Sequence, residues 1–254
     1  MSGYFESTPV DSLLGQIEAA EAEHLSLYGG EVRQVGRLCA IFAGPELPVN
    51  VACGFGSSPD GLEKLLDSVE AFYTLHGLPS RLVLYSHFGD WEALAARGYS
   101  LLRLLHVYTL LLTERPAPPP MPSPSQLAAR PSPPAEFLSV ASRAFGVGSE
   151  AIMERTAQWP QTQFFATELG GQPVAAAFSV FGSLALLFSA AMLPAFRGQS
   201  AQTALLAARL HAAHGAGATV AAVMTTSGSA SERNVQRAGF VLAGAHLSME
   251  QVRA

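Results

Sequence analysis

A proline-rich segment near the middle of the chain constrains the fold more than any other feature of the sequence. Nine of the 17 prolines lie between residues 114 and 134, in the run ERPAPPPMPSPSQLAARPSPP. Proline fixes φ and lacks an N–H donor, so this run cannot continue a helix or a central strand. It predicts a stiff, extended linker over 116–134 between two domains, 1–115 and 135–254. A long surface loop inside one domain is the alternative interpretation.

The two sides of this segment show the same order of predicted elements. In the first half we expect strands at 37–44 and 49–56, a helix at 61–77, a strand at 81–86, a helix at 90–96 and a strand at 101–112. In the second half we expect strands at 163–169, 173–181 and 183–193, a helix at 200–213, a strand at 218–225, a helix at 229–238 and a strand at 240–250.

The spacing of glycines supports a duplicated unit. Gly56 and Gly98 are 42 residues apart, and Gly198 and Gly239 are 41 residues apart. A Gly-aromatic pair, Gly98-Tyr99 or Gly239-Phe240, precedes the last strand of each half. This agreement is what a repeated α/β unit gives. Two unrelated α/β units remain the weaker alternative.

Composition excludes several classes of protein. A net charge of -5 with 14% charged residues argues against a nucleic-acid-binding surface. Two cysteines, Cys39 and Cys53, are too few for a disulfide scaffold or a CxxC metal site. No apolar run reaches about 18 residues and the first residues do not resemble a secretory signal, so we expect a cytoplasmic protein without a membrane span. The 49% hydrophobic content predicts a large core and a buried interface between halves.

The segment AMLPAFRGQSAQTALLAARL, residues 191–210, carries the clearest sign of chemistry. A predicted strand ends at Pro194, a loop of small and polar residues follows, and an alanine-rich helix begins. The N-terminus of a helix presents free N–H groups and the positive end of its dipole, so it suits a phosphate group. The pattern alone is a moderate signal, because many α/β proteins have such a turn without a ligand.

This segment resembles the GNAT superfamily of N-acetyltransferases, in which R/Q-x-x-G-x-G/A opens the helix after a V-x-P strand end. Arg197 and Gly198 match that pattern, whereas Ser200 and Gln202 replace its later small residues. The ending SERNVQRAGF, 231–240, and the early stretch QIEAAEA, 16–22, are also similar to a tandem subgroup of the family. The resemblance covers nearly the whole chain. It implies an α/β (α+β) fold of two GNAT-like domains, each a mixed, mostly antiparallel sheet flanked by helices.

The resemblance implies that acetyl-CoA binds the second half as a co-substrate and that a small amine accepts the acetyl group in a ternary complex. The coenzyme-binding residues it implies are Ala191, Met192, Leu193, Arg197, Gly198, Gln199, Ser200, Ala201, Gln202, Thr203, Ser229 and Asn234. Ser229 as a helix cap and Asn234 as a surface residue are the ordinary alternatives. In the first half, Pro59 and Asp60 stand where the phosphate loop would be, so this half is expected to have lost its coenzyme site.

The sequence shows no obvious general acid or base for the proton transfers of an acetyltransferase. The position of the proton-donating tyrosine of many relatives is Val235, and all six tyrosines lie in the first half. Three options remain: Tyr85 or Tyr108 from the first half, His246 or Ser231 in the second, or orientation and water alone, which we rank first. His211 and His214 have no third ligand in view, so no metal is expected.

Two classes of function fit these features. The first is an N-acetyltransferase acting on a small-molecule amine, with no nucleic-acid or membrane partner. The alternative is a non-catalytic CoA-binding or interaction module, which the changes at Ser200, Gln202 and Val235 favour. Either protein is expected to be a monomer with an internal pseudo-dimer, or a homodimer.

Overall fold

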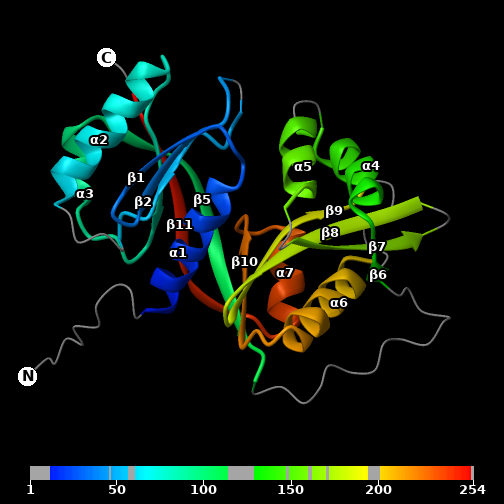
Figure 1. Ribbon diagram of the computed structural model, residues 1–254. Helices are drawn as coiled ribbons and strands as arrows, with labels where there is room; N and C mark the ends of the chain where they lie inside the picture. Colours follow the sequence, from blue (N-terminus) through cyan, green and yellow to red (C-terminus); the bar gives the residue numbers. More distant parts are fainter. Residues whose placement is uncertain are drawn as a thin grey trace, which may run out of the picture. The chain divides into compact units, whose positions relative to one another are not determined.

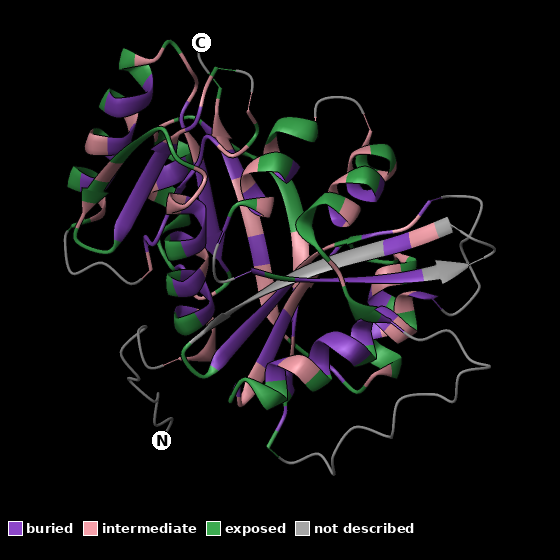
Figure 2. Cartoon of the chain, turned by 45° about the vertical axis from the view of Figure 1, so that its right-hand side comes forward, coloured by how far each residue is buried: buried purple, intermediate pink, exposed green. Residues whose placement is uncertain are grey.

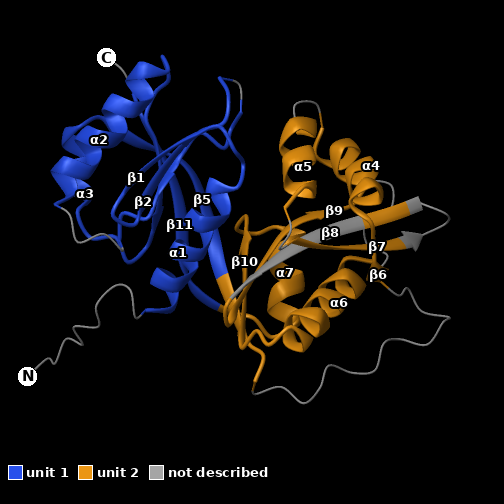
Figure 3. Ribbon diagram, in the orientation of Figure 1, with its two compact units in different colours: residues 1–107, 242–254 blue, residues 108–241 orange. Residues whose placement is uncertain are grey.

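The chain forms two compact units in a computed structural model, which describes residues 12–45, 47–56, 61–113, 129–146, 149–159, 162–169, 172–193 and 201–252. Unit 1 comprises residues 1–107 and 242–254, and unit 2 comprises residues 108–241 (Figure 3). Residues 114–128 of the proline-rich run and the loop 194–200 lie outside the described residues.

Unit 1 is a sheet with helices (Figure 1). Its elements are α1 (Leu13–Ser26), β1 (Glu31–Val35), β2 (Leu38–Phe42), β3 (Ala52–Cys53), α2 (Leu62–Leu75), β4 (Arg81–Tyr85), α3 (Trp91–Ala96), the first part of β5 (Tyr99–Leu111) and nearly all of β11 (Val241–Gln251). The strand order is β1-β2-β3-β4-β11-β5. β3 and β4 pair in parallel, and β1–β2, β2–β3 and β4–β11 pair antiparallel.

The core of unit 1 lies between α2 and the sheet. Leu65, Leu66, Val69 and Phe72 recur at helical spacing and are buried. Four of the five residues of β4 are also buried, and Figure 2 shows where buried residues lie on the strands and helices. The Tyr73 hydroxyl, at the end of this apolar face, donates to the carbonyl of Ile41 at 2.9 Å, so its polar group is satisfied inside the core.

Unit 2 is also a sheet with helices, and it has four helices where the described part of unit 1 has three. Its elements are the end of β5, β6 (Arg130–Pro131), α4 (Pro134–Phe145), α5 (Glu150–Ala157), β7 (Thr162–Leu169), β8 (Gln172–Phe181), β9 (Leu184–Ala191), α6 (Ala201–Gly215), β10 (Val220–Thr225) and α7 (Ala230–Arg237). The strand order is β5-β10-β9-β8-β7-β6. β9–β10 is parallel, and β6–β7, β7–β8 and β8–β9 are antiparallel.

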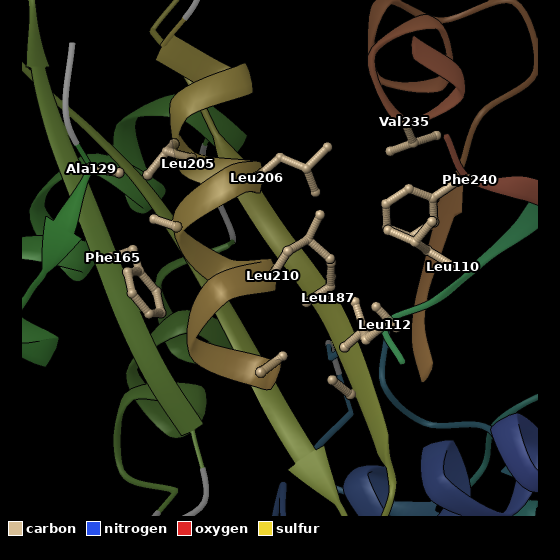
Figure 4. Close-up of a cluster of buried hydrophobic side chains, with 14 of the residues drawn as sticks. Leu110, Leu112, Ala129, Phe165, Leu187, Leu205, Leu206, Leu210, Val235 and Phe240 are labelled. Carbon is tan, nitrogen blue, oxygen red and sulfur yellow. The ribbon is translucent and has the colours of Figure 1, made fainter. Parts of the chain in front are cut away.

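Two apolar clusters fill unit 2. Leucines of α6 pack with residues of β5, β9 and α7, among them Leu187 and Val235 (Figure 4). A second cluster joins α4 and α5 to β7 and β9 through Phe137, Met153 and Phe164. Among the described helices, none combines the length and apolar character needed to cross a membrane.

The predicted fold class is confirmed: the structure is a mixed, mostly antiparallel sheet flanked by helices. The expected strands and helices of both halves are present, whereas α1, β1, β6, α4 and α5 were not predicted. The end of the predicted linker, 116–134, is not a linker: β6 lies within it, and α4 begins at its last proline, Pro134. Proline is tolerated in the first turn of a helix, so these prolines concealed a helix start.

The duplication seen in the sequence has a structural counterpart. α3 and α7 both end before a glycine with positive φ, Gly98 at 77° and Gly239 at 90°. A glycine in this left-handed conformation is a common helix ending, because it has no Cβ to clash. In both halves the next strand starts at or beside the aromatic residue that follows.

The last strand of each half crosses from one unit to the other. β5 begins in unit 1, but Tyr108 and the residues after it belong to unit 2. β11 follows α7 of unit 2, yet from Leu242 onward it belongs to unit 1, where it pairs with β4. The compact units therefore divide at different residues from the predicted domains 1–115 and 135–254, which follow the duplication and stay a prediction.

This crossing makes a prediction for the C-terminal strand. Met249 on β11 is buried in the core of unit 1 opposite Leu82, so Met249→Ala should lower the free energy of unfolding by about 3 kcal/mol. Hydrogen exchange should show the loss of protection in α2. Leu242→Ala, at a residue 53% exposed on the same strand, is the control. A loss confined to α6 would contradict the placement of β11.

Candidate functional site

The centre of unit 2 has two parallel strands that pair over only part of their length. β9 and β10 pair from Leu184 with Val220 to Leu187 with Val223. Beyond these residues β9 continues to Ala191 and β10 to Thr225 without a pairing between them. Backbone N–H and C=O groups need partners when they are shielded from water. The end of β9 is therefore suited to pair with an extended ligand.

A bulge interrupts β9 at the point where this pairing ends. Opposite β8, the register shifts between the pairs Ala177–Phe188 and Ala175–Ala191, so β9 contains an extra residue. Ser189 lies in this bulge with φ of 54°, and it is the one non-glycine residue with positive φ in the described chain. Such a conformation costs about 1–3 kcal/mol and is often found at functional sites.

The bulge reverses the alternation of side chains along β9. Ala185 and Leu187 face the α6 cluster. Residues 187 and 191 would share a face in a regular strand, because side chains alternate with a period of two. Ala191 instead packs with Phe188 in the α4–α5 cluster. Two residues predicted to bind the coenzyme at the end of this strand therefore pack in different clusters. Ala191 packs in the α4–α5 cluster, and Met192 packs against the α6 cluster.

The first turn of α6 lies close to α7. Ala201 is buried, Gln202 is half-buried and Thr203 is exposed. Asn234 on α7 donates from Nδ2 to Gln202 Oε1 at 2.9 Å. The structure thus brings together two predicted coenzyme residues from different helices. The other predicted residues of the loop, Arg197, Gly198, Gln199 and Ser200, lie outside the described residues, and their roles stay predictions.

Helix α7 is capped and tied to β5. Ser229 is its N-cap and accepts from the Glu232 backbone N–H at 3.1 Å, so the ordinary interpretation of Ser229 is confirmed. Glu232 is buried and accepts from the Tyr108 hydroxyl at 3.0 Å. Gln236 donates to the same hydroxyl at 2.7 Å. Desolvation, and then Glu232, raise the pKa of Tyr108.

Two results follow for the predicted proton donors of unit 2. Val235, at the position where the resemblance would place a proton-donating tyrosine, is buried in the apolar core. Tyr108 nevertheless brings a phenol into unit 2 from the first half of the chain. Ser231 is half-buried in α7. No group of three or more His, Cys, Asp or Glu side chains suited to a metal occurs among the residues that the structure describes.

Sequence reasoning missed Arg209, a buried charge on α6. The residue is 3% exposed, and its guanidinium donates from Nη2 to the carbonyl of Phe188 at 3.1 Å. Burial lowers the pKa of Arg209 to about 9. In the sequence, Arg209 stands in an apolar helix among alanines and leucines, and that contrast was the available signal.

His246 takes part in a buried polar network of unit 1. Its Nε2 lies 3.2 Å from Glu21 Oε1, and Tyr85 donates to Glu21 Oε2 at 2.8 Å. The two groups come from β11 and β4, where they stand opposite each other, and Glu21 comes from α1. The role of His246 as a base stays a prediction; in the structure its Nε2 contacts a carboxylate of its own unit.

A second carboxylate of α1 contacts Gly56, which belongs to the glycine-rich stretch CGFGSSPDG, residues 53–61, at the place of a phosphate loop in the first half. Glu18 is 1% exposed and accepts from the backbone N–H of Gly56 through Oε1 at 3.2 Å. Its Oε2 lies 3.0 Å from His87 Nε2. An internal carboxylate thus uses a backbone donor of the stretch that resembles a phosphate loop.

The pKa values in this network follow from burial and pairing. Burial opposes the charge of Glu21, but His246 and Tyr85 outweigh it, so the pKa of Glu21 is lowered. Burial likewise opposes the charge of His246, but Glu21 outweighs it and the pKa of His246 is raised. Both shifts favour the charged forms, an imidazolium at His246 and a carboxylate at Glu21. Burial lowers the pKa of His24 to about 4 and raises the pKa of Cys53. Both cysteines are free and buried.

The fold is that of GNAT proteins. No protein-family model and no curated protein matches the sequence. A GCN5-related N-acetyltransferase from Kribbella flavida is similar in structure, with a TM-score of 0.72 at 13% identity, over 96% of this chain and 97% of that one. A conserved protein of unknown function from Staphylococcus epidermidis gives 0.60 at 12% identity, over 91% and 97%.

A tandem GNAT protein from the clavulanic acid biosynthesis pathway is also similar. Its TM-score is 0.57 at 14% identity, over 76% of this chain and 70% of that one. At such identities the likeness establishes the fold. The GNAT fold agrees with what the sequence motifs predicted.

The ion pair of unit 1 predicts a pH dependence of stability. A raised pKa of His246 stabilises the fold below about pH 6.5, and this contribution is lost as the pH rises through the folded value. A lowered pKa of Glu21 stabilises it above about pH 4.5, and this contribution is lost as the pH falls through the folded value. The stability difference between wild type and His246→Gln should therefore be greatest between these pH values, at about 3 kcal/mol.

Urea denaturation from pH 4 to pH 8 measures this difference. The lowered pKa of His24 also makes the protein less stable as the pH falls. Wild type and His246→Gln both contain His24, so their difference in stability does not include this contribution. His211→Gln, at an exposed residue of α6, is the control and should follow wild type at every pH. A difference for His246→Gln that does not change with pH would show that no ion pair forms.

Proposed function

We propose that the protein is an acetyl-CoA-dependent N-acetyltransferase that transfers an acetyl group to a small amine in a single ternary complex. One observation carries the proposal: in a GNAT fold, β9 and β10 separate at a bulge at Ser189, and the first turn of α6 follows in the chain. This arrangement offers backbone partners to an extended thioester and a helix N-terminus to phosphate groups.

The described residues fit the coenzyme chemically. From Leu184 to Leu193, and over the first turn of α6, the chain has no carboxylate that would repel a pyrophosphate. Gln202 and Asn234 place amide groups beside this turn. Ala191, Met192 and Leu193 would flank the pantetheine arm, and residues 197–203 would hold the phosphates. When bound, acetyl-CoA supplies the activated acetyl thioester.

The chain contributes mainly orientation and electrostatic stabilisation. The amine nitrogen forms a bond to the acetyl carbon as the carbon–sulfur bond breaks, and the proton lost by the amine finally resides on the coenzyme thiol. Backbone N–H groups at the bulge would face the carbonyl oxygen as negative charge develops there. Water carries the protons in this proposal, because Val235 is apolar and the hydroxyl of Tyr108 is engaged by Glu232 and Gln236.

Unit 1 has a supporting role in this proposal. Glu18 uses the N–H of Gly56, and an internal anion there opposes the binding of a second pyrophosphate. We therefore assign the coenzyme to unit 2 and regard the first half as a degenerate copy. The net charge of -5 favours a cationic amine as acceptor. The protein is proposed to act as a monomer or homodimer without nucleic acid or membrane.

A non-catalytic CoA-binding module is the second candidate. The buried Val235 favours it, because this position holds a proton-donating tyrosine in many GNAT enzymes. Measuring the release of free CoA thiol against a panel of small amines separates the two functions. An enzyme gives amine-dependent release, whereas a binding module binds acetyl-CoA without it.

Coenzyme binding itself is tested by thermal unfolding in the presence of acetyl-CoA. A ligand that binds only the folded protein stabilises it by about 2.7 kcal/mol at 100 times its Kd, so the Tm should rise with concentration. Gly198→Asp should abolish the rise, because it places a negative charge where the pyrophosphate is proposed to bind.

Gly61→Asp is the matched control. It adds the same charge at another helix N-terminus, the N-cap of α2, where a new side chain meets no atom within 4 Å. Its response to acetyl-CoA should equal that of wild type. A Tm that acetyl-CoA leaves unchanged in wild type would refute both candidate functions, and unchanged binding by Gly198→Asp would refute the placement of the loop.

A further inference from the structure

Arg209 links helix α6 to the bulge of β9. Its guanidinium donates to the carbonyl of Phe188, the residue immediately before Ser189. Ser189 has the positive φ, and the alternation of side chains reverses across it. One buried side chain thus holds the peptide group at which the alternation of side chains between the two clusters reverses.

A guanidinium at this place is costly. Arg209 is 3% exposed, and removing a cation from water opposes folding unless hydrogen bonds compensate. The lowered pKa of about 9 expresses the same cost. The neighbouring Leu205, Leu206 and Leu210 are buried in the α6 cluster, so apolar side chains pack well on this helix. The hydrogen bond of Arg209, rather than the space it fills, therefore distinguishes it from its neighbours.

The position of the contact suggests its purpose. The Phe188 ring packs in the α4–α5 cluster, whereas its carbonyl accepts from a residue of α6, whose leucines pack in the other cluster of unit 2. Holding both the ring and the carbonyl fixes the orientation of the following peptide. The backbone conformation at Ser189 costs free energy and persists only where its surroundings determine it.

We propose that Arg209 is a positioning residue that fixes the β9 bulge, and with it the backbone N–H groups of Ser189 and Ala190 toward the acetyl thioester. This inference rests on the proposed function. Donors aimed at a developing negative charge are effective only when they are preorganised. A displacement of about 1 Å can cost about a hundredfold in rate. Arg209 therefore acts through the bulge and touches no substrate in this proposal.

The first test uses the protein without ligand. In Arg209→Met, which keeps an unbranched side chain and removes the donors, a crystal structure should show Ser189 leaving positive φ. The amide resonances of Ser189 and Ala190 should shift, and their hydrogen exchange should accelerate. Arg143→Met, at an exposed arginine of α4, is the control and should leave these amides unchanged.

The second test separates binding from turnover. For Arg209→Met, the Kd for acetyl-CoA, measured by calorimetry, should stay within about threefold of wild type, while kcat with an accepted amine falls at least tenfold. Arg209→Lys keeps the charge but lacks the planar fork of donors, so its kcat should lie between those of Arg209→Met and wild type. A merely structural residue would change kcat and Kd together with stability.

The outcomes distinguish the two proposals. If wild type binds no acetyl-CoA, the proposed function fails, and with it the assignment of Arg209 to this reaction. If wild type binds and reacts, but Arg209→Met retains positive φ at Ser189 and a kcat within twofold, the inference about Arg209 alone is overturned. Should Arg209→Met not fold, Arg209→Lys is judged by the same two criteria.

Discussion

The incomplete pairing of β9 with β10 is the constraint on which the rest of unit 2 depends. Parallel strands stay together while their hydrogen bonds continue, and here the pairing ends at Leu187 and Val223. Around that point the side chains of β9 pack in the two apolar clusters of unit 2, one formed with α6 and the other with α4 and α5. The strained backbone at Ser189 and the buried charge of Arg209 occur together at this point. Both are costly, and both lie where the proposed coenzyme would bind.

Unit 1 uses buried polar groups for a different purpose. Its carboxylates at Glu18 and Glu21 are satisfied by groups of the same unit, namely Gly56, His87, Tyr85 and His246. Because the two carboxylates come from α1, and their partners come from Gly56, from β4 and the turn after it, and from β11, the network joins segments far apart in the sequence. It holds the C-terminal strand in unit 1 by charge and hydrogen bonds, in addition to the apolar contact of Met249. The two units therefore share a plan but differ in where their charge is buried.

Much of the fold could be predicted because its signals are local. The apolar spacing in α2, the alanine-rich run of α6 and the glycines after α3 and α7 each determine an element within a few residues. The candidate site was less accessible. The hydrogen bond between Gln202 and Asn234 joins residues far apart in the chain, and Arg209 carries no motif. The bulge at Ser189 depends on its register with β8, which no local pattern reveals.

By itself, the sequence determined two repeated α/β halves, their proline-rich connection and the resemblance to GNAT proteins, since these depend on residue type and spacing. Only the tertiary structure decided which unit each final strand joins: Tyr108 enters unit 2 and His246 enters unit 1. The second half of the sequence has no tyrosine, yet unit 2 of the structure contains Tyr108 from the first half. Strand pairing is a long-range choice governed by partners and packing, so the strand's own sequence cannot reveal it.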